Sequence, residues 1–98
     1  MPEKIMGVAW YYEQQWDKVR SYSKDRASMP KTFAEWLKSA QEAVQKWESA
    51  GITVHKVYVD VDMLVAWAKK HRLDIDGRTR SDYANHLLAM SFGVNKDV

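Results

Sequence analysis

Hydrophobic and polar residues alternate most clearly in the segment from Gly51 to Asp62, which reads GITVHKVYVDVD. In an extended chain, successive side chains point to opposite sides. Val57, Val59 and Val61 would share one side, and Val54, Lys56 and Tyr58 the other. Residues 53–59 are mostly β-branched or aromatic, as strands prefer. The pattern predicts a buried strand, entered from a helix through Gly51 and left into another helix at Asp60.

A shorter apolar run near the start of the chain predicts a first strand from Met6 to Tyr11, with residues 1–5 as a loose lead-in. Tyr12, Trp16 and Val19 then recur at i, i+4 and i+7, which predicts a helix over residues 13–24 with one apolar face. Residues 25–30 are expected to form a loop, because a proline at position 30 disfavours helical backbone before it.

The clearest helix signal begins at Thr32. Glu35 follows Thr32 at the spacing of a capping box. The apolar residues that follow fall on one stripe of a helix, and they are Phe33, Trp36, Leu37, Ala40, Val44 and Trp47. Gly51 stands where a helix often ends in a residue with positive φ.

Two further helices are predicted after the central strand. The first runs from about Val61 to Arg72, with Asp60 or Asp62 as its cap. Its apolar residues cover about half of the helix circumference, so it must be covered on two sides, by this chain or by another. The second is capped by Asp76 and runs over residues 78–90, and its inward residues are expected to be Tyr83, Ala84, Leu87, Leu88 and Met90. Residues from about 91 onward are expected to form a tail.

The element order is therefore β-α-α-β-α-α in one domain over residues 1–98. We expect a small α/β (or α+β) fold, with a two-stranded parallel sheet packed by four helices. A sheet of two strands is thin, and its edges need to be covered or paired.

Composition narrows the function classes only slightly. Cysteine is absent, which excludes disulfides, thiolate metal sites and thiol catalysis. The net charge of +2 does not by itself indicate a nucleic-acid or membrane partner. The start of the chain lacks a signal-peptide core and no apolar run is long enough to cross a bilayer, so we expect a cytoplasmic protein that needs no cofactor.

If the two strands are parallel and adjacent, their carboxyl ends bring Tyr11, Tyr12, Asp60 and Asp62 to one edge of the sheet. These side chains could line a polar cleft for a cationic or hydroxylated group, floored by Trp10. The alternative is a self-capped structural corner, in which the two aspartates satisfy helix N–H groups. No metal site is predicted, because the aspartates stand at helix starts and the three histidines are scattered.

Basic residues concentrate only around the end of the third predicted helix, and they are Lys69, Lys70, Arg72, Arg78 and Arg80. They are candidates for phosphate contacts. The alternative is an ordinary solvated helix end, because Asp74, Asp76 and Asp82 dilute the charge.

The pattern favours a self-associating structural or interaction domain, and we expect a homodimer. The reasons are the five tryptophans and five tyrosines, the thin sheet and the wide apolar arc of the third helix. Met63 and Trp67 are the candidate interface residues, although Trp67 could instead belong to the core. The alternatives are a nucleic-acid-binding or protein-binding regulatory module and, third, a metal-dependent enzyme that uses Asp60 and Asp62.

Four spaced segments together resemble a group of short uncharacterised bacterial proteins: AWY at 9–11, TFAEWL at 32–37, VDVD at 59–62 and AW at 66–67. The resemblance spans roughly residues 7–90. It implies a bacterial, soluble, cytoplasmic protein, and it carries no activity, cofactor or functional residue with it.

Overall fold

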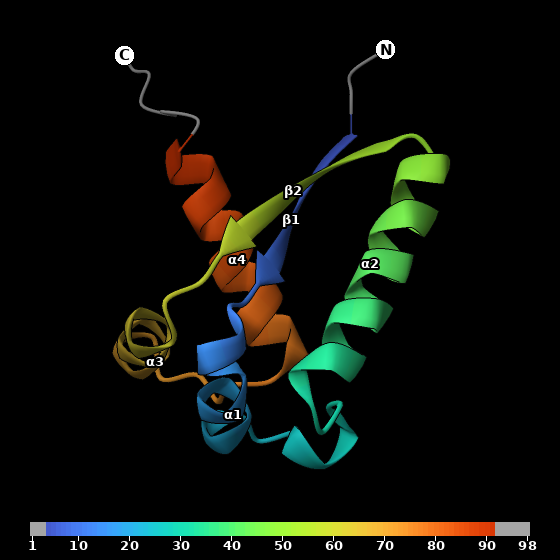
Figure 1. Ribbon diagram of the computed structural model, residues 1–98. Coiled ribbons are helices and arrows are strands. Elements are labelled where there is room, and N and C mark those ends of the chain that lie inside the picture. The colour runs from blue at the N-terminus through green and yellow to red at the C-terminus, as the bar shows by residue number, and fades with distance from the viewer. Residues whose placement is uncertain (1–3, 92–98) are drawn as a thin grey trace, which may run out of the picture.

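A computed structural model describes residues 4–91 of the chain (Figure 1). Its elements are β1 (Lys4–Trp10), α1 (Glu13–Tyr22), the short 3-10 helix η1 (Arg26–Ser28), α2 (Phe33–Ser49), β2 (Ile52–Tyr58), α3 (Val61–Lys70) and α4 (Gly77–Ser91). The predicted β-α-α-β-α-α order is confirmed, with four α-helices around a two-stranded sheet. The predicted tail lies outside the described residues, except that Ser91 is the last residue of α4.

The two strands are parallel and in register from Lys4 opposite Ile52 to Trp10 opposite Tyr58. Helices α4 and α2 lie on opposite sides of the sheet, and α1 and α3 lie beyond its carboxyl end (Figure 1). Trp10 meets Trp36 of α2, whereas Gly7 meets α4. The even-numbered residues of both strands therefore face α2, and the odd-numbered residues face α4.

Two predictions about the strands are wrong. The first strand is Lys4–Trp10 rather than residues 6–11, because Lys4 and Ile5 pair with β2 instead of forming a loose lead-in. The central strand is not buried, since every residue of β2 is half-buried or exposed. A sheet of two strands has no inner strand, so apolar sequence alone could not bury β2.

The predicted start of α2 is confirmed. Glu35 donates its backbone N–H to the Thr32 hydroxyl, and the Glu35 carboxylate accepts the backbone N–H of Thr32, which completes a capping box. At the other end of the helix, Gly51 has a φ of 90°, a conformation that residues with a side chain rarely adopt.

Aspartates cap the two later helices, as predicted. Asp60 accepts the N–H of Met63 at the start of α3, and Asp76 accepts the N–H of Thr79 at the start of α4. The hydrogen bond from Thr79 holds the pKa of Asp76 below its usual value.

The hydrophobic core lies where α1, α3 and α4 meet below the carboxyl end of the sheet. Its centre is formed by Trp16, Val19, Val61, Leu64, Ala68, Tyr83 and Ala84, all buried. Two predicted inward residues are not there, since Met90 is 60% exposed and Tyr12 is 54% exposed. Tyr12 precedes α1 and stacks on Tyr58, with the ring centroids 4.7 Å apart.

Helix α2 is covered much less than the other helices. Its predicted stripe does face the sheet, but only Val44 of the stripe is fully buried. Within residues 4–91, no helix combines the length and apolar character that a membrane crossing requires.

Candidate functional site

The four residues expected at the carboxyl end of the sheet do not form one site. Asp60 caps α3, and Asp62 pairs with Lys18 of α1 at 2.6 Å, which raises the pKa of that lysine. Tyr12 stacks on Tyr58 at the surface. Tyr11 alone turns inward, into a pocket that the other three do not line. Both carboxylates thus have structural partners.

The five basic residues that are candidates for phosphate contacts do not form one cluster either. Lys69, Lys70, Arg72 and Arg78 are exposed around the end of α3 and the start of α4, where Arg78 lies 3.9 Å from Asp82. The guanidinium of Arg80 is separated from them, because it forms an ion pair with Asp25. The set that could contact phosphates is therefore smaller than the sequence indicated.

The candidate interface residues Met63 and Trp67 line a shallow apolar groove between α3 and α4, together with Leu87 and Met90. Met63 is 60% exposed. Trp67 is half-buried against the core, and its ring centroid lies 5.2 Å from that of Tyr83. This side of α3 is the part of its apolar arc that the described chain does not cover.

The edge of β1 is closed by a side chain of α4. The amide of Asn85 accepts the Gly7 N–H at 2.9 Å and donates to the Gly7 carbonyl at 3.2 Å. A side-chain amide thus takes the place that a neighbouring strand would occupy. Gly7 makes this possible, because a Cβ there would lie 3.1 Å from the Asn85 oxygen and 3.1 Å from Leu88.

The edge of β2 has no such cover in the described part of the chain, and we call it the open edge. The Gly7 backbone points away from β2, and the Trp10 carbonyl accepts the Val59 N–H, so the ladder uses the even-numbered residues of β1 and the odd-numbered residues of β2. The backbone groups that point outward belong to Ile52, Val54, Lys56 and Tyr58. Within residues 4–91 these outward N–H and C=O groups have no hydrogen-bond partner.

An aromatic pocket of about 220 Å³ opens between α1, α2 and η1. Tyr11, Trp16 and Trp36 form its walls, and the two indoles stack with centroids 5.2 Å apart. Met29 and Pro30 also line it. The pocket thus combines aromatic walls with polar and charged groups, at the side of the sheet that carries α2.

Two polar atoms of the pocket walls are buried without a hydrogen-bond partner in the described part of the chain. They are the hydroxyl of Tyr11 and the indole N–H of Trp16, and these residues are only 4% and 2% exposed. Burial raises the pKa of Tyr11 to about 12, so its hydroxyl keeps its proton at neutral pH. Unpaired buried donors are costly and therefore uncommon.

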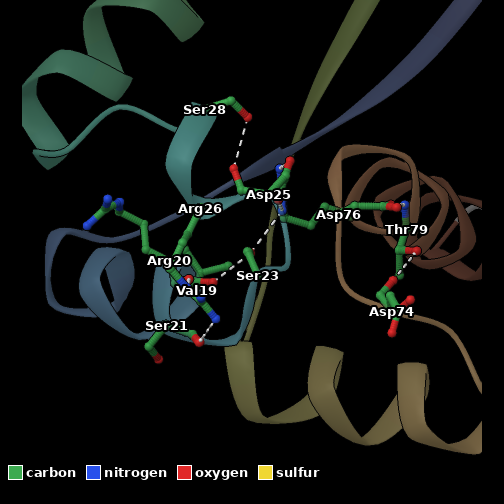
Figure 2. A network of polar contacts seen from close by, with 11 residues as sticks. Val19, Arg20, Ser21, Ser23, Asp25, Arg26, Ser28, Asp74, Asp76 and Thr79 are labelled. Atoms are coloured by element: carbon green, nitrogen blue, oxygen red, sulfur yellow. Dashed lines mark hydrogen bonds and ion pairs between the residues drawn. The ribbon is translucent and has the colours of Figure 1, made fainter.

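The Arg80–Asp25 ion pair forms the polar side of the same pocket. Arg80 donates to both carboxylate oxygens at 2.8 and 2.9 Å, and also to the hydroxyl of Ser23 at 2.9 Å. The hydrogen bond from Arg80 holds the pKa of Asp25 below its usual value. Figure 2 shows Asp25 beside Ser23 after the end of α1, with Asp76 and Thr79 from the start of α4 nearby. The pair therefore ties the loop after α1 to α4.

Sequence reasoning missed most of these features because they join residues distant in the chain. Asn85 lies 78 residues from Gly7, and Arg80 lies 55 residues from Asp25. Gly7 inside an apolar run was the one available signal, since glycine in a strand often marks a close approach of another backbone or side chain.

Within residues 4–91, no group of three histidine, aspartate or glutamate side chains is placed to hold a metal ion. Comparisons with protein-family models, with curated proteins and with solved structures found no match for this chain. The functional argument therefore starts from the open edge.

Proposed function

We propose that this protein is a self-associating interaction domain, in which two copies pair through the open edges of β2 to form one four-stranded sheet. The observation that supports this is the contrast between the edges, since a helix side chain occupies the middle of the β1 edge, whereas the outward backbone groups of β2 have no hydrogen-bond partner in the described chain. An unprotected edge is a template for another strand. Four strands also reach the usual size of a stable sheet.

A two-fold axis makes the two β2 strands antiparallel, and charge selects their register. If Lys56 faced its own copy, two like charges would lie directly opposite each other, which is destabilising. Shifting the pairing by two residues places Val54 opposite Lys56 of the second copy, and Ile52 opposite Tyr58. Both pairs avoid the repulsion, and the pair of Ile52 with Tyr58 combines a β-branched residue with an aromatic one, which favours pairing.

The same arrangement explains why α2 is poorly covered. Residues directly opposite each other in a sheet point to the same face, so both copies of α2 would lie on one face of the joined sheet. The half-buried side chains of Ala43 and Trp47 lie on that helix, where they line a shallow groove. The second copy of α2 would bury this surface further.

The mass of the protein in solution at tens of micromolar tests the proposal. The unaltered chain is expected to be a dimer. Val54→Lys would place a lysine opposite Lys56 twice, and should weaken the dimer by about tenfold. Val54→Lys combined with Lys56→Glu should restore it, because each repulsive pair becomes an attractive one. Circular dichroism of each variant checks that the fold is retained.

Met63→Asp is the matched control, since Met63 is exposed on α3, away from the sheet edge. It should leave the dimer unchanged. Dissociation by Met63→Asp but not by Val54→Lys would move the interface to the groove between α3 and α4. A monomeric mass for the unaltered chain would end the proposal.

A further inference from the structure

We propose that Tyr12 and Tyr58 form an oxidative cross-linking site, at which a peroxide-driven one-electron oxidant joins the two phenol rings into a dityrosine within one chain. The proposal does not rest on self-association, because Tyr58 of one copy would lie opposite Ile52 of the other in the proposed dimer, and not opposite a tyrosine. Its basis is the contact between the two rings, their exposure and the absence of cysteine.

The two rings are already in contact in the folded chain, although they are distant in the sequence. Their centroids lie 4.7 Å apart and their planes are inclined by 18°. Trp10 pairs with Tyr58 across the sheet, so the backbone that leaves β1 brings Tyr12 to the end of β2. Because the fold holds the reacting groups together, their coupling is a step within one molecule, and it is much faster than coupling between separate chains.

Exposure separates this pair from the other tyrosines. Tyr12 is 54% exposed and Tyr58 is 51% exposed, so an oxidant in solution reaches both rings. Tyr11 and Tyr83 are buried, and Tyr22 is exposed but stacks on no other tyrosine among the described residues. The described part of the chain therefore presents one pair of tyrosines that is both accessible and in contact.

The reaction balances with hydrogen peroxide as the terminal oxidant. Each tyrosine gives up one electron and its phenolic proton, which leaves a neutral radical shared between the oxygen and the ring carbons ortho to it. A bond forms between one such carbon of each ring, and the hydrogen on each joined carbon then moves to the phenol oxygen. The two electrons and two protons reduce one peroxide to two waters. No cysteine thiol competes for the oxidant, because the chain contains none.

The new bond would join the end of β2 to the residue that precedes α1. It would close a loop of the chain as a disulfide does, in a protein that cannot form one. Closing a loop restricts the unfolded chain, so the cross-linked protein should unfold at a higher urea concentration than the same protein before oxidation. A lower urea midpoint would overturn this stabilising role.

The test oxidises the unaltered protein at micromolar concentration with a haem peroxidase and hydrogen peroxide. Dityrosine is followed by its blue fluorescence, and mass spectrometry of the denatured product should show single chains that are lighter by two hydrogens. Peptide mapping should find the bond between Tyr12 and Tyr58. The absence of dityrosine, dityrosine only between separate chains, or a bond at Tyr22 in place of this pair would overturn the proposal.

Tyr58→Phe isolates the phenol of the pair. It keeps the stacked ring but removes the oxygen that gives up the proton, so the cross-link within the chain should be lost. The variant should fold, because the residue is exposed and its ring is retained. Tyr22→Phe, at an exposed tyrosine on α1, is the matched control and should leave the yield of the cross-link unchanged. An undiminished yield in Tyr58→Phe, or an equal loss in Tyr22→Phe, would overturn the assignment.

Discussion

The two edges of the sheet differ although the two strands are alike. Both strands have seven residues and pair along their whole length, in a sheet with α4 on one face and α2 on the other. The edge of β1 is closed by the side-chain amide of Asn85, whereas the outward backbone groups of β2 have no partner among the described residues.

A single glycine accounts for much of this difference. At Gly7 the absence of a Cβ lets α4 approach closely enough for Asn85 to reach the strand backbone. Strand β2 has a side chain at every position, so it offers no comparable site of close approach. In this small domain a helix side chain closes a strand edge at a position where the strand has no side chain of its own.

Removing the side-chain amide of Asn85 at the closed edge should have the largest effect on the free energy of unfolding. In Asn85→Ala the N–H and carbonyl of Gly7 lose their partner beneath α4, and we expect the free energy of unfolding to fall by about 2–3 kcal/mol. Denaturation in urea measures it. Asn85→Asp is the graded control, since it keeps an acceptor for the Gly7 N–H but loses the donor. A loss below about 0.5 kcal/mol in Asn85→Ala would mean that water replaces the amide without cost.

A smaller loss is expected at the Arg80–Asp25 pair, which is remote from both edges. Asp25→Asn removes the charge of a half-buried pair, and should lower the free energy of unfolding at pH 7 by roughly 1–2 kcal/mol. The mass in solution should stay unchanged, which separates general instability from the loss of an edge contact. A changed mass would contradict the independence of the two regions.

The pH dependence of the free energy of unfolding gives a second measurement of the Arg80–Asp25 pair. Because the pKa of Asp25 is lower in the folded protein than in the unfolded chain, the folded protein binds fewer protons at acidic pH. The contribution of the pair is therefore fully present above the unfolded pKa of about 3.9, and is lost as the pH falls through the folded pKa. Unfolding measured from pH 6 to pH 2 should show a weaker acid dependence in Asp25→Asn than in the unaltered protein.

Some features of the fold could be predicted from the sequence, and others could not. The helix ends at Thr32, Asp60 and Asp76 were predicted, because a cap acts within three residues of its partner. The parallel pairing followed from the order of the elements. These features depend on local chemistry or on chain connectivity, and both are visible in the sequence.

The candidate site was less predictable. Tyr11 was expected to face Asp60, and Arg80 was placed with the basic residues around α3, yet both line the pocket. Their direction depends on where α1 and α4 pack, which no local pattern encodes. Burial of β2 was overestimated for a similar reason. The apolar residues of a strand indicate that it is stabilised by burial, but they do not show whether the fold contains a third strand that could bury it.

The smallest expected effect is also the sharpest test of the open edge, and it concerns Lys56. Its ammonium lies 4.6 Å from the centre of the Trp10 ring, a contact worth about 0.5–1 kcal/mol at an exposed site. Lysine on a strand edge also discourages pairing with another strand. Lys56→Met keeps the apolar stem and removes the charge, so the free energy of unfolding of the monomer should fall slightly while the dimer becomes tighter. Urea denaturation at low concentration and mass measured over a dilution series follow the two quantities separately, with Lys56→Arg as the charge-retaining control. If both quantities fell together, Lys56 would be holding the dimer together through its charge, and the pairing of Val54 with Lys56 would be the wrong register.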